Sequence, residues 1–133
     1  FGGRGISLHL AAGLPPRPAD RARLQLLLRN LLDNALRHGG GTAVELHTAA
    51  THGGGWRLTV RDHGPGVDPA ALAHLGEAFY RPDAARSRAA GGVGLGLHLC
   101  RLVVHSHGGT LQWRNAAPGL EAAVSLPAAA APG

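Results

Sequence analysis

The stretch from Asp20 to His38, DRARLQLLLRNLLDNALRH, has the pattern of one amphipathic helix. At about 100° per residue, its apolar side chains fall on one broad arc: Leu24, Leu27, Leu28, Leu31, Leu32 and Ala35. Gln25, Arg29 and Asp33 lie on the opposite side. Asp20 precedes the first turn, where an N-cap residue is expected. The rest of the chain is therefore organised around this helix.

Two asparagines, Asn30 and Asn34, lie one turn apart at the edge of this arc, and Arg37 and His38 extend the same row. Asparagine is a mediocre helix former, because its side chain competes for backbone hydrogen bonds, so two at a core margin indicate a role beyond packing. A carboxamide oxygen suits Mg²⁺, whose other ligands are usually waters and substrate phosphates. The alternative, a pair of polar residues on a solvated flank, stays open on the helix alone.

The length and composition predict one globular domain, because 133 residues are enough to bury about two-thirds of the unfolded surface. No apolar run approaches a membrane span, and no signal-peptide pattern is present. The chain starts at Phe1, so we expect a piece of a longer protein whose membrane anchor, if it has one, lies upstream. The single cysteine, Cys100, excludes an internal disulfide and is typical of the cytoplasm. Its neighbours Leu99 and Val103 predict a small buried side chain rather than a reactive thiol.

The net charge is +5, and all 13 basic residues are arginine. The lack of lysine excludes a P-loop, which needs one on the phosphates. Arginine favours bidentate recognition of phosphate or carboxylate, and a nucleic-acid surface is the rival interpretation. However, only Arg81, Arg86 and Arg88 cluster, and one tyrosine with two phenylalanines leaves little for base stacking. We therefore expect no nucleic-acid partner.

Five segments alternate apolar and polar residues as half-buried strands do. They are Ile6–Leu10, Val44–Thr48, Trp56–Arg61, Leu111–Trp113 and Ala122–Leu126. Two further helices are expected over Pro69–Leu75, capped by Asp68, and over Gly94–His107, with Leu95, Leu99, Leu102 and Val103 as its apolar positions. One apolar face per strand predicts a two-layer α/β sandwich with a mixed, mainly antiparallel sheet. We expect the domain to span residues 1–127, followed by a frayed tail over residues 128–133.

Two glycine-containing motifs indicate ligand binding. In Asp62-His-Gly-Pro-Gly66, a carboxylate at a strand end can accept from an amino group, such as that of adenine, while the glycines let the backbone approach a flat ring. The same residues are also good turn formers, which is the simpler interpretation of this motif alone. The run from Gly91 to Gly96 enters a helix, where bare N–H groups can cradle phosphate. It is not a Rossmann fingerprint, because its spacing differs and no strand precedes it.

Taken together and in order, four motifs resemble the N, G1, F and G2 boxes of bacterial sensor histidine kinases. In this chain they read Asn30-Leu-Leu-Asp-Asn34-Ala, Asp62-His-Gly-Pro-Gly66, Phe79-Tyr-Arg81 and Gly92-Val-Gly94-Leu-Gly96-Leu. The resemblance extends from the first predicted strand to Ser125-Leu-Pro127. It implies the Bergerat (GHKL) ATP-binding fold, with five strands and three helices on one face of the sheet. The strand pattern alone predicts the same two-layer architecture.

The resemblance also implies roles for individual residues. Asn34 would bind Mg²⁺ with Asn30 as a second or direct ligand, and Arg37 and His38 would face the phosphates of ATP. Asp62 would accept from the adenine amino group, with Gly64 and Gly66 shaping the pocket. Phe79 would hinge a mobile lid over residues 77–92, in which an arginine reaches the γ-phosphate. The remaining nucleotide contacts implied are Tyr80, Arg86, Arg88, Gly92, Val93, Gly94, Leu95, Gly96 and Leu97.

The resemblance further implies the reaction. Related ATPases of this fold carry a glutamate where this chain has Asn30, and use it to activate water; an amide cannot act as a general base. Transfer of the γ-phosphoryl group to another nucleophile, which needs mainly positioning and charge stabilisation, is the better interpretation. In the resembling family, that nucleophile is a histidine on a separate dimerisation domain, and a response regulator acts downstream. No direct membrane contact is expected of this chain.

None of the nine histidines lies in an H-E/D-x-x-T/N-P context, so an internal phosphoacceptor is not expected. No zinc site is expected from the sequence, because the chain lacks the ligand spacings and cysteines of zinc-binding sequence motifs. Two alternative functions stay open at this point. One is an anti-sigma-factor serine kinase of the same fold, although such kinases usually keep the glutamate. The other is a scaffold that binds nucleotide without transferring phosphate.

Overall fold

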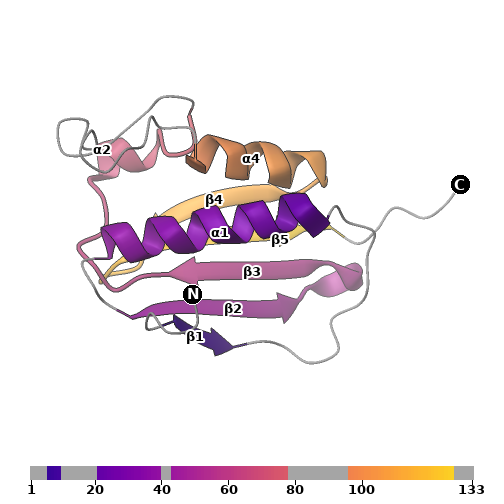
Figure 1. The fold of residues 1–133 in the computed structure, drawn as a ribbon, viewed down its shortest axis with the longest axis horizontal. Helices are drawn as coiled ribbons and strands as arrows, with labels where there is room; N and C mark the ends of the chain where they lie inside the picture. The colour runs from indigo at the N-terminus through magenta and orange to yellow at the C-terminus, as the bar shows by residue number, and fades with distance from the viewer. Residues whose placement is uncertain (1–5, 10–20, 40–42, 78–95, 128–133) are drawn as a thin grey trace, which may run out of the picture.

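The computed structural model describes residues 6–9, 21–39, 43–77 and 96–127 (Figure 1). Five strands form one sheet in the order β1-β2-β3-β5-β4. Their bounds are β1 (Ile6–His9), β2 (Val44–Ala50), β3 (Trp56–Arg61), β4 (Thr110–Asn115) and β5 (Leu120–Leu126). The β1–β2 pair is parallel and the other three pairs are antiparallel. The predicted mixed, mainly antiparallel sheet is therefore confirmed.

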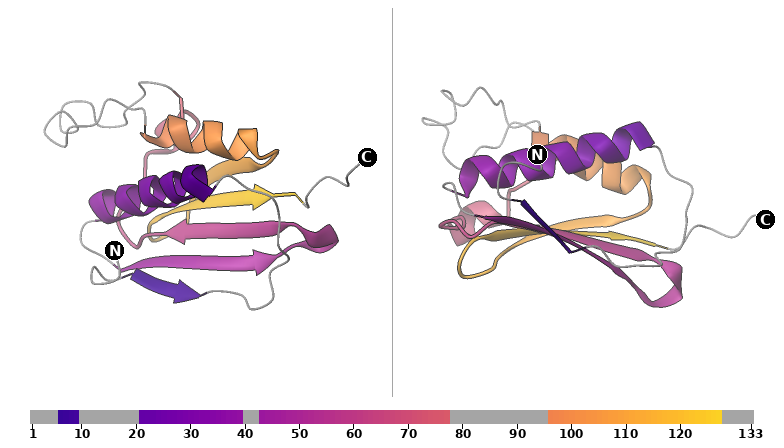
Figure 2. Two further views of the ribbon diagram at one scale, coloured as in Figure 1. Left: turned by 45° about the vertical axis from the view of Figure 1, so that its right-hand side comes forward. Right: turned by 60° about the horizontal axis from the view of Figure 1, so that its bottom comes forward.

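The helices are α1 (Arg21–His38), α2 (Pro69–Leu72) and α4 (Gly96–Ser106), and a short 3-10 turn, η1 (His52–Gly54), joins β2 to β3. Figure 2 shows α1 and α4 side by side over one face of the sheet. No helix of the described ranges covers the other face. None of the described helices is long and apolar enough to cross a membrane.

The core lies between this helical layer and the sheet. The buried side of α1 is the predicted arc, with Leu27, Leu31 and Ala35 less than 5% exposed. The sheet contributes the inward-facing positions of its strands. These are Val44, Leu46, Val60, Leu111, Ala122, Val124 and Leu126. Burying one apolar arc of a helix against alternate positions of a sheet gives the two-layer fold its stability.

The apolar face predicted for the last helix is partly wrong. Leu99 and Leu102 are 41% and 50% exposed, whereas Cys100, Val103 and Val104 are buried. The buried set follows the same i, i+3, i+4 spacing, rotated by about one residue around the helix. Leucines lie on both sides of this helix, so periodicity alone did not select the arc that meets α1 and β4.

Several element ends differ from those predicted. Helix α2 ends at Leu72 rather than Leu75, although Leu75 is still buried in the turn that follows. Asp68 caps this helix as expected, because its Oδ1 accepts from the Ala70 N–H at 3.0 Å. The predicted cap Asp20 and the predicted strand end Leu10 lie outside the described residues.

Candidate functional site

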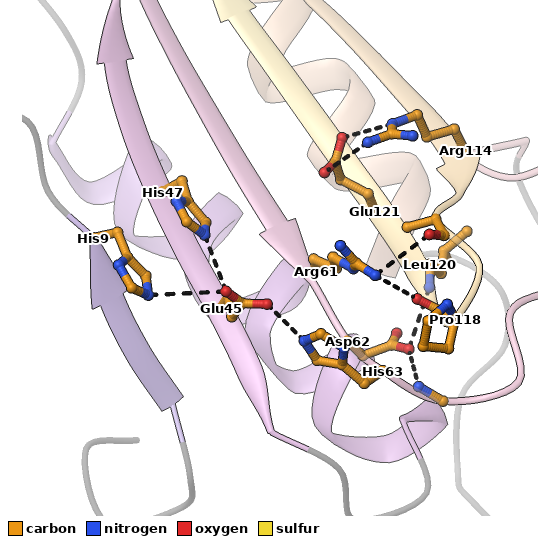
Figure 3. Close-up of polar contacts among 12 residues, drawn as sticks. His9, Glu45, His47, Arg61, Asp62, His63, Arg114, Pro118, Leu120 and Glu121 are labelled. Carbon is orange, nitrogen blue, oxygen red and sulfur yellow. Dashed lines mark hydrogen bonds and ion pairs between the residues drawn. The ribbon is translucent and has the colours of Figure 1, made fainter.

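The site is built around Asp62, which follows the last residue of β3 and is 2% exposed. Its Oδ1 accepts from the backbone N–H of Gly64 at 2.9 Å and from that of Leu120 at 3.3 Å (Figure 3). Among the described residues, Asp62 is the one buried charged side chain, and both of its side-chain hydrogen bonds go to the same oxygen. Within the described residues Oδ2 has no such bond and can accept from a further donor, which would help to offset the lost hydration of a buried carboxylate.

A small cavity opens beside this carboxylate. Asn34 of α1 and Asp62 both line it, so residues of the first two sequence motifs meet here. The other lining residues are Leu31, Ala35, Val60, Trp113, Leu120 and Ala122. Apolar walls with a few convergent polar groups are typical of small-molecule binding sites in general.

The glycines of the Asp62 motif bring the backbone close to its neighbours. A Cβ at Gly64 would lie 2.8 Å from the Cα of Gly39, the residue that follows α1. Gly66 has a φ of +74°, and a Cβ there would lie 2.6 Å from Oδ1 of Asn115. The loop is thus held against the end of α1 on one side and against β4 on the other, and the predicted role of these glycines in shaping a nucleotide pocket stays a prediction.

Asn115 fixes the far end of this loop and was not predicted from the sequence. Its Oδ1 accepts from the Val67 N–H at 2.9 Å, and its Nδ2 donates to the Val67 carbonyl at 2.8 Å. Trp113, on the same strand, lines the cavity, and its Nε1 is buried without a hydrogen-bond partner among the described residues. Neither residue belongs to a recognisable sequence motif. Both reach the loop only because β4 pairs with β5, and such long-range pairing cannot be predicted from a local pattern.

Asn30 lies next to the start of α4. Its Oδ1 is the nearest atom, at 3.7 Å, to a Cβ built on Gly96, and its Nδ2 is buried without a partner among the described residues. A buried amide with no partner is costly unless a ligand satisfies it. A half-turn of the amide exchanges its oxygen and nitrogen, so either atom can face a ligand. The structure thus places Asn30, the first asparagine of its motif, beside Gly96, the last glycine of the G2-like motif.

Arg37 and His38 lie in the last turn of α1, and both are exposed. The Arg37 Nε is 3.1 Å from Oδ2 of Asp33, one turn earlier. Neither side chain lines the cavity, so their predicted contact with phosphates stays a prediction. Leu97, predicted to contact nucleotide, packs partly buried against the core. The other residues of the predicted lid and glycine motif lie outside the described residues: Phe79, Tyr80, Arg86, Arg88, Gly92, Val93, Gly94 and Leu95.

The amino-acid sequence is similar to those of bacterial sensor proteins. The chain is 46% identical over 124 residues to Sensor protein QseC of Salmonella typhimurium. This alignment covers 90% of this chain and 25% of that protein. It is 43% identical over 124 residues to the probable sensor histidine kinase TcrY of Mycobacterium tuberculosis, covering 88% and 26%. The chain thus spans about a quarter of the length of these curated relatives.

Solved structures agree with this fold. Full-length ShkA, in complex with AMPPNP, superposes with a TM-score of 0.79 at 32% identity, over 99% of this chain and 27% of that one. The mycobacterial sensor histidine kinase MprB superposes with a TM-score of 0.79 at 29% identity, over 98% and 89%. Residues 19–130 match the family described as histidine kinase-, DNA gyrase B-, and HSP90-like ATPases. Fold, motif order and this match together place the chain in that family, to which it belongs.

Proposed function

We propose that the chain binds ATP with Mg²⁺ and supplies the γ-phosphoryl group for phosphorylation of a histidine on a separate dimerisation domain of a two-component sensor. A response regulator would then take the phosphoryl group from that histidine. The relatives support this proposal, since they are named as sensor proteins and sensor histidine kinases. The AMPPNP in the ShkA complex supports adenine nucleotide as the ligand of the shared fold.

One observation carries the proposal: a buried carboxylate, Asp62, lies at a cavity with apolar walls, and both of its side-chain hydrogen bonds within the described part of the chain go to Oδ1. The exocyclic amine of adenine donates to Oδ2, while Oδ1 keeps its bonds to the backbone. Leu31 and Val60, which line the cavity, would contact the flat face of the ring. Guanine carries an oxygen where adenine carries this amine, so the site selects ATP over GTP.

The two asparagines of α1 fit a magnesium site. Their carboxamide oxygens are neutral ligands of the kind that Mg²⁺ takes beside waters and phosphates. The Nδ2 of Asn30 has no partner in the described part of the chain, so a half-turn of the amide can present the oxygen in its place. When bound, Mg²⁺ would neutralise charge on the phosphates. Asn34, which also lines the cavity, would place that charge next to the nucleotide.

The residues around the cavity favour transfer over hydrolysis. Of the described residues that line it, Asp62 is the one titratable group, and backbone N–H groups hold it at the adenine end. Neither Asn30 nor Asn34 can take a proton from water. The chain therefore positions ATP, and a nucleophile from another domain completes the reaction.

Asp62→Asn tests the adenine contact. The amide oxygen can still accept from Gly64 and Leu120, but its NH₂ then faces the adenine amine, donor against donor. We expect ATP affinity by calorimetry to fall at least about tenfold, with little change in melting temperature. Asp68→Asn, which alters the exposed cap of α2, is the matched control and should bind ATP as the parent does. Unchanged ATP binding by folded Asp62→Asn would show that adenine lies elsewhere.

Phosphoryl transfer is tested separately, with labelled ATP and the purified dimerisation domain of the parent sensor. The proposal expects acid-labile label on that added domain. Acid-stable label would indicate a serine kinase instead. Binding without any transfer would indicate a nucleotide-binding scaffold.

A further inference from the structure

The face of the sheet opposite the helices carries a cluster of imidazoles around one carboxylate (Figure 3). His9 comes from β1, Glu45 and His47 come from β2, and His63 follows β3. The register explains why they meet: His9 pairs with His47 across the parallel β1–β2 ladder, and Glu45 lies two residues before His47 on the same face. Because Val44 and Leu46 point into the core, these alternate residues point outward.

We propose that His9, Glu45 and His47 form a Zn²⁺ site at the β1–β2 edge of the sheet. Their ligand atoms all lie within 4.8 Å of one another. Oε1 of Glu45 is 3.3 Å from Nε2 of His47 and 3.9 Å from Nε2 of His9. In a tetrahedral site with bonds of about 2.0–2.1 Å, neighbouring ligand atoms are roughly 3.3–3.4 Å apart. Small side-chain rotations therefore bring all three atoms to one ion.

The donor set selects the class of metal. Two imidazole nitrogens and one carboxylate oxygen suit Zn²⁺, which takes a water as its fourth ligand in such open sites. Mg²⁺ prefers oxygen donors and is not expected to compete. The rings of His9 and His47 are stacked at 4.3 Å between centroids, so their Nε2 ends must tilt towards each other for both nitrogen lone pairs to face the ion.

His63 positions the carboxylate without being one of the three ligands. Its Nε2 is 2.6 Å from Oε2 of Glu45, which leaves Oε1 directed at His9 and His47. This contact is the main cause that lowers the pKa of Glu45, with His47 contributing. Metal-binding carboxylates are commonly oriented by such a neighbouring hydrogen bond.

The site has a structural consequence. Strand β1 lies at the edge of the sheet and pairs only with β2 among the described strands. A metal held by His9 on one strand and by two residues of the next would fasten that edge. The site is on the sheet face away from α1, so it is separate from the proposed ATP and Mg²⁺ site, and each can be tested without the other.

The test measures Zn²⁺ uptake by the full chain against a chromophoric chelator, at a pH above the ordinary histidine pKa of about 6.5. We expect one Zn²⁺ per chain and a higher melting temperature with the metal. His47→Ala and Glu45→Gln should each weaken binding at least about tenfold and abolish the thermal shift. His105→Ala removes an exposed histidine on α4 and is the matched control, which should bind as the parent does.

A second measurement needs no variant. Co²⁺ in a tetrahedral site absorbs visible light strongly, and Zn²⁺ should displace it while a large excess of Mg²⁺ should not. Nitrogen-detected NMR of the parent should show metal-induced shifts at Nε2 of His9 and His47. The proposal is overturned if the chain takes up no Zn²⁺. It is equally overturned if His47→Ala and Glu45→Gln bind Zn²⁺ as tightly as the parent, or if Mg²⁺ removes the Co²⁺ signal.

Discussion

The backbones of Gly64 and Gly39 pack directly against each other. Any side chain at position 64 would place its Cβ 2.8–2.9 Å from the Cα, carbonyl carbon and oxygen of Gly39. The N–H of Gly39, which follows α1, donates to the Ala35 carbonyl, and the N–H of Gly64 donates to Oδ1 of Asp62. This contact joins the end of the asparagine helix to the loop of the proposed adenine site.

Gly64→Ala should therefore damage both stability and nucleotide binding. The methyl group meets backbone, which cannot rotate away, so we expect a loss of about 1–3 kcal/mol of folding free energy. ATP affinity should fall as well, because the loop must move from the end of α1. Chemical denaturation and calorimetry measure the two effects.

Gly53→Ala is the control for this variant. Gly53 has a φ of +80°, and a Cβ there would have nothing within 4 Å. The alanine therefore meets no clash, but its backbone strain should lower the folding free energy by about 1–2 kcal/mol in a turn remote from the cavity. It should lower stability and leave ATP affinity unchanged. Equal loss of ATP affinity in both variants would mean that Gly64 acts only through global stability.

Asn115→Asp should loosen the loop that carries Gly66. The variant replaces a donor by an oxygen 2.8 Å from the Val67 carbonyl, so one hydrogen bond becomes a repulsion. We expect a cost of about 1 kcal/mol and faster hydrogen exchange of residues 64–68. Gln112→Glu introduces the same charge at an exposed position of the same strand, and should not change the exchange of that loop. Equal exchange in both variants would contradict the role given to Asn115.

Periodicity predicted the parts of this fold that depend on local pattern. The arc of α1 and the alternation of the central strands are set by the need to bury one face, so Leu27, Leu31 and Val60 were identified correctly as core, whereas Leu8 of the edge strand β1 is 60% exposed. On α4 the same argument failed, because Leu99 and Leu102 offered a second apolar stripe. Which stripe is buried depends on contacts with α1, which are not encoded locally.

In the candidate site, too, some residues could be predicted from local sequence motifs and others depend on contacts between distant segments. Asp62 and Asn34 belong to sequence motifs, and both line one cavity in the structure, while their predicted contacts with adenine and Mg²⁺ stay predictions. Asn115 and Trp113 reach the loop only through the pairing of β4 with β5. His9 and His47 meet because distant segments pair in parallel, and a search for closely spaced ligands along the chain does not detect such a set. The i, i+2 pair Glu45 and His47 on a predicted strand was the one local signal.

Cys100 should be inert in the folded chain. Burial raises the pKa of its thiol to about 12, and its side chain is fully enclosed between α4 and α1, with Sγ 3.8 Å from the Leu27 carbonyl. At pH 8, roughly one molecule in 10,000 carries the thiolate, the form that reacts. Alkylation followed by mass spectrometry should be slow in buffer and fast in denaturant, and it reports one site, since the chain has a single cysteine.

The raised pKa of Cys100 also predicts that the stability of the fold depends on pH. A thiol whose pKa is higher in the folded state than its ordinary value of 9.0 stabilises the fold fully below pH 9. That contribution is lost as the pH rises from 9 towards 12. Cys100→Ala should lack this alkaline loss, so the difference in stability between parent and variant should change between pH 8 and pH 11. A difference that is constant over this range would contradict the burial argument.

Trp113 should report nucleotide binding by its fluorescence. Its ring lines the cavity beside Asp62 and Asn34, so a base that enters contacts the indole and changes its emission. The second tryptophan, Trp56, begins β3 and lies roughly 20 Å from Asp62 at about 3.3 Å per strand residue. The two tryptophans thus form a matched pair, one at the proposed site and one remote from it. Trp56→Phe, which keeps Trp113, should show an emission change that saturates with ATP, whereas Trp113→Phe should show none. A response from Trp113→Phe alone would place the nucleotide at the other end of the sheet and overturn the site proposed around Asp62.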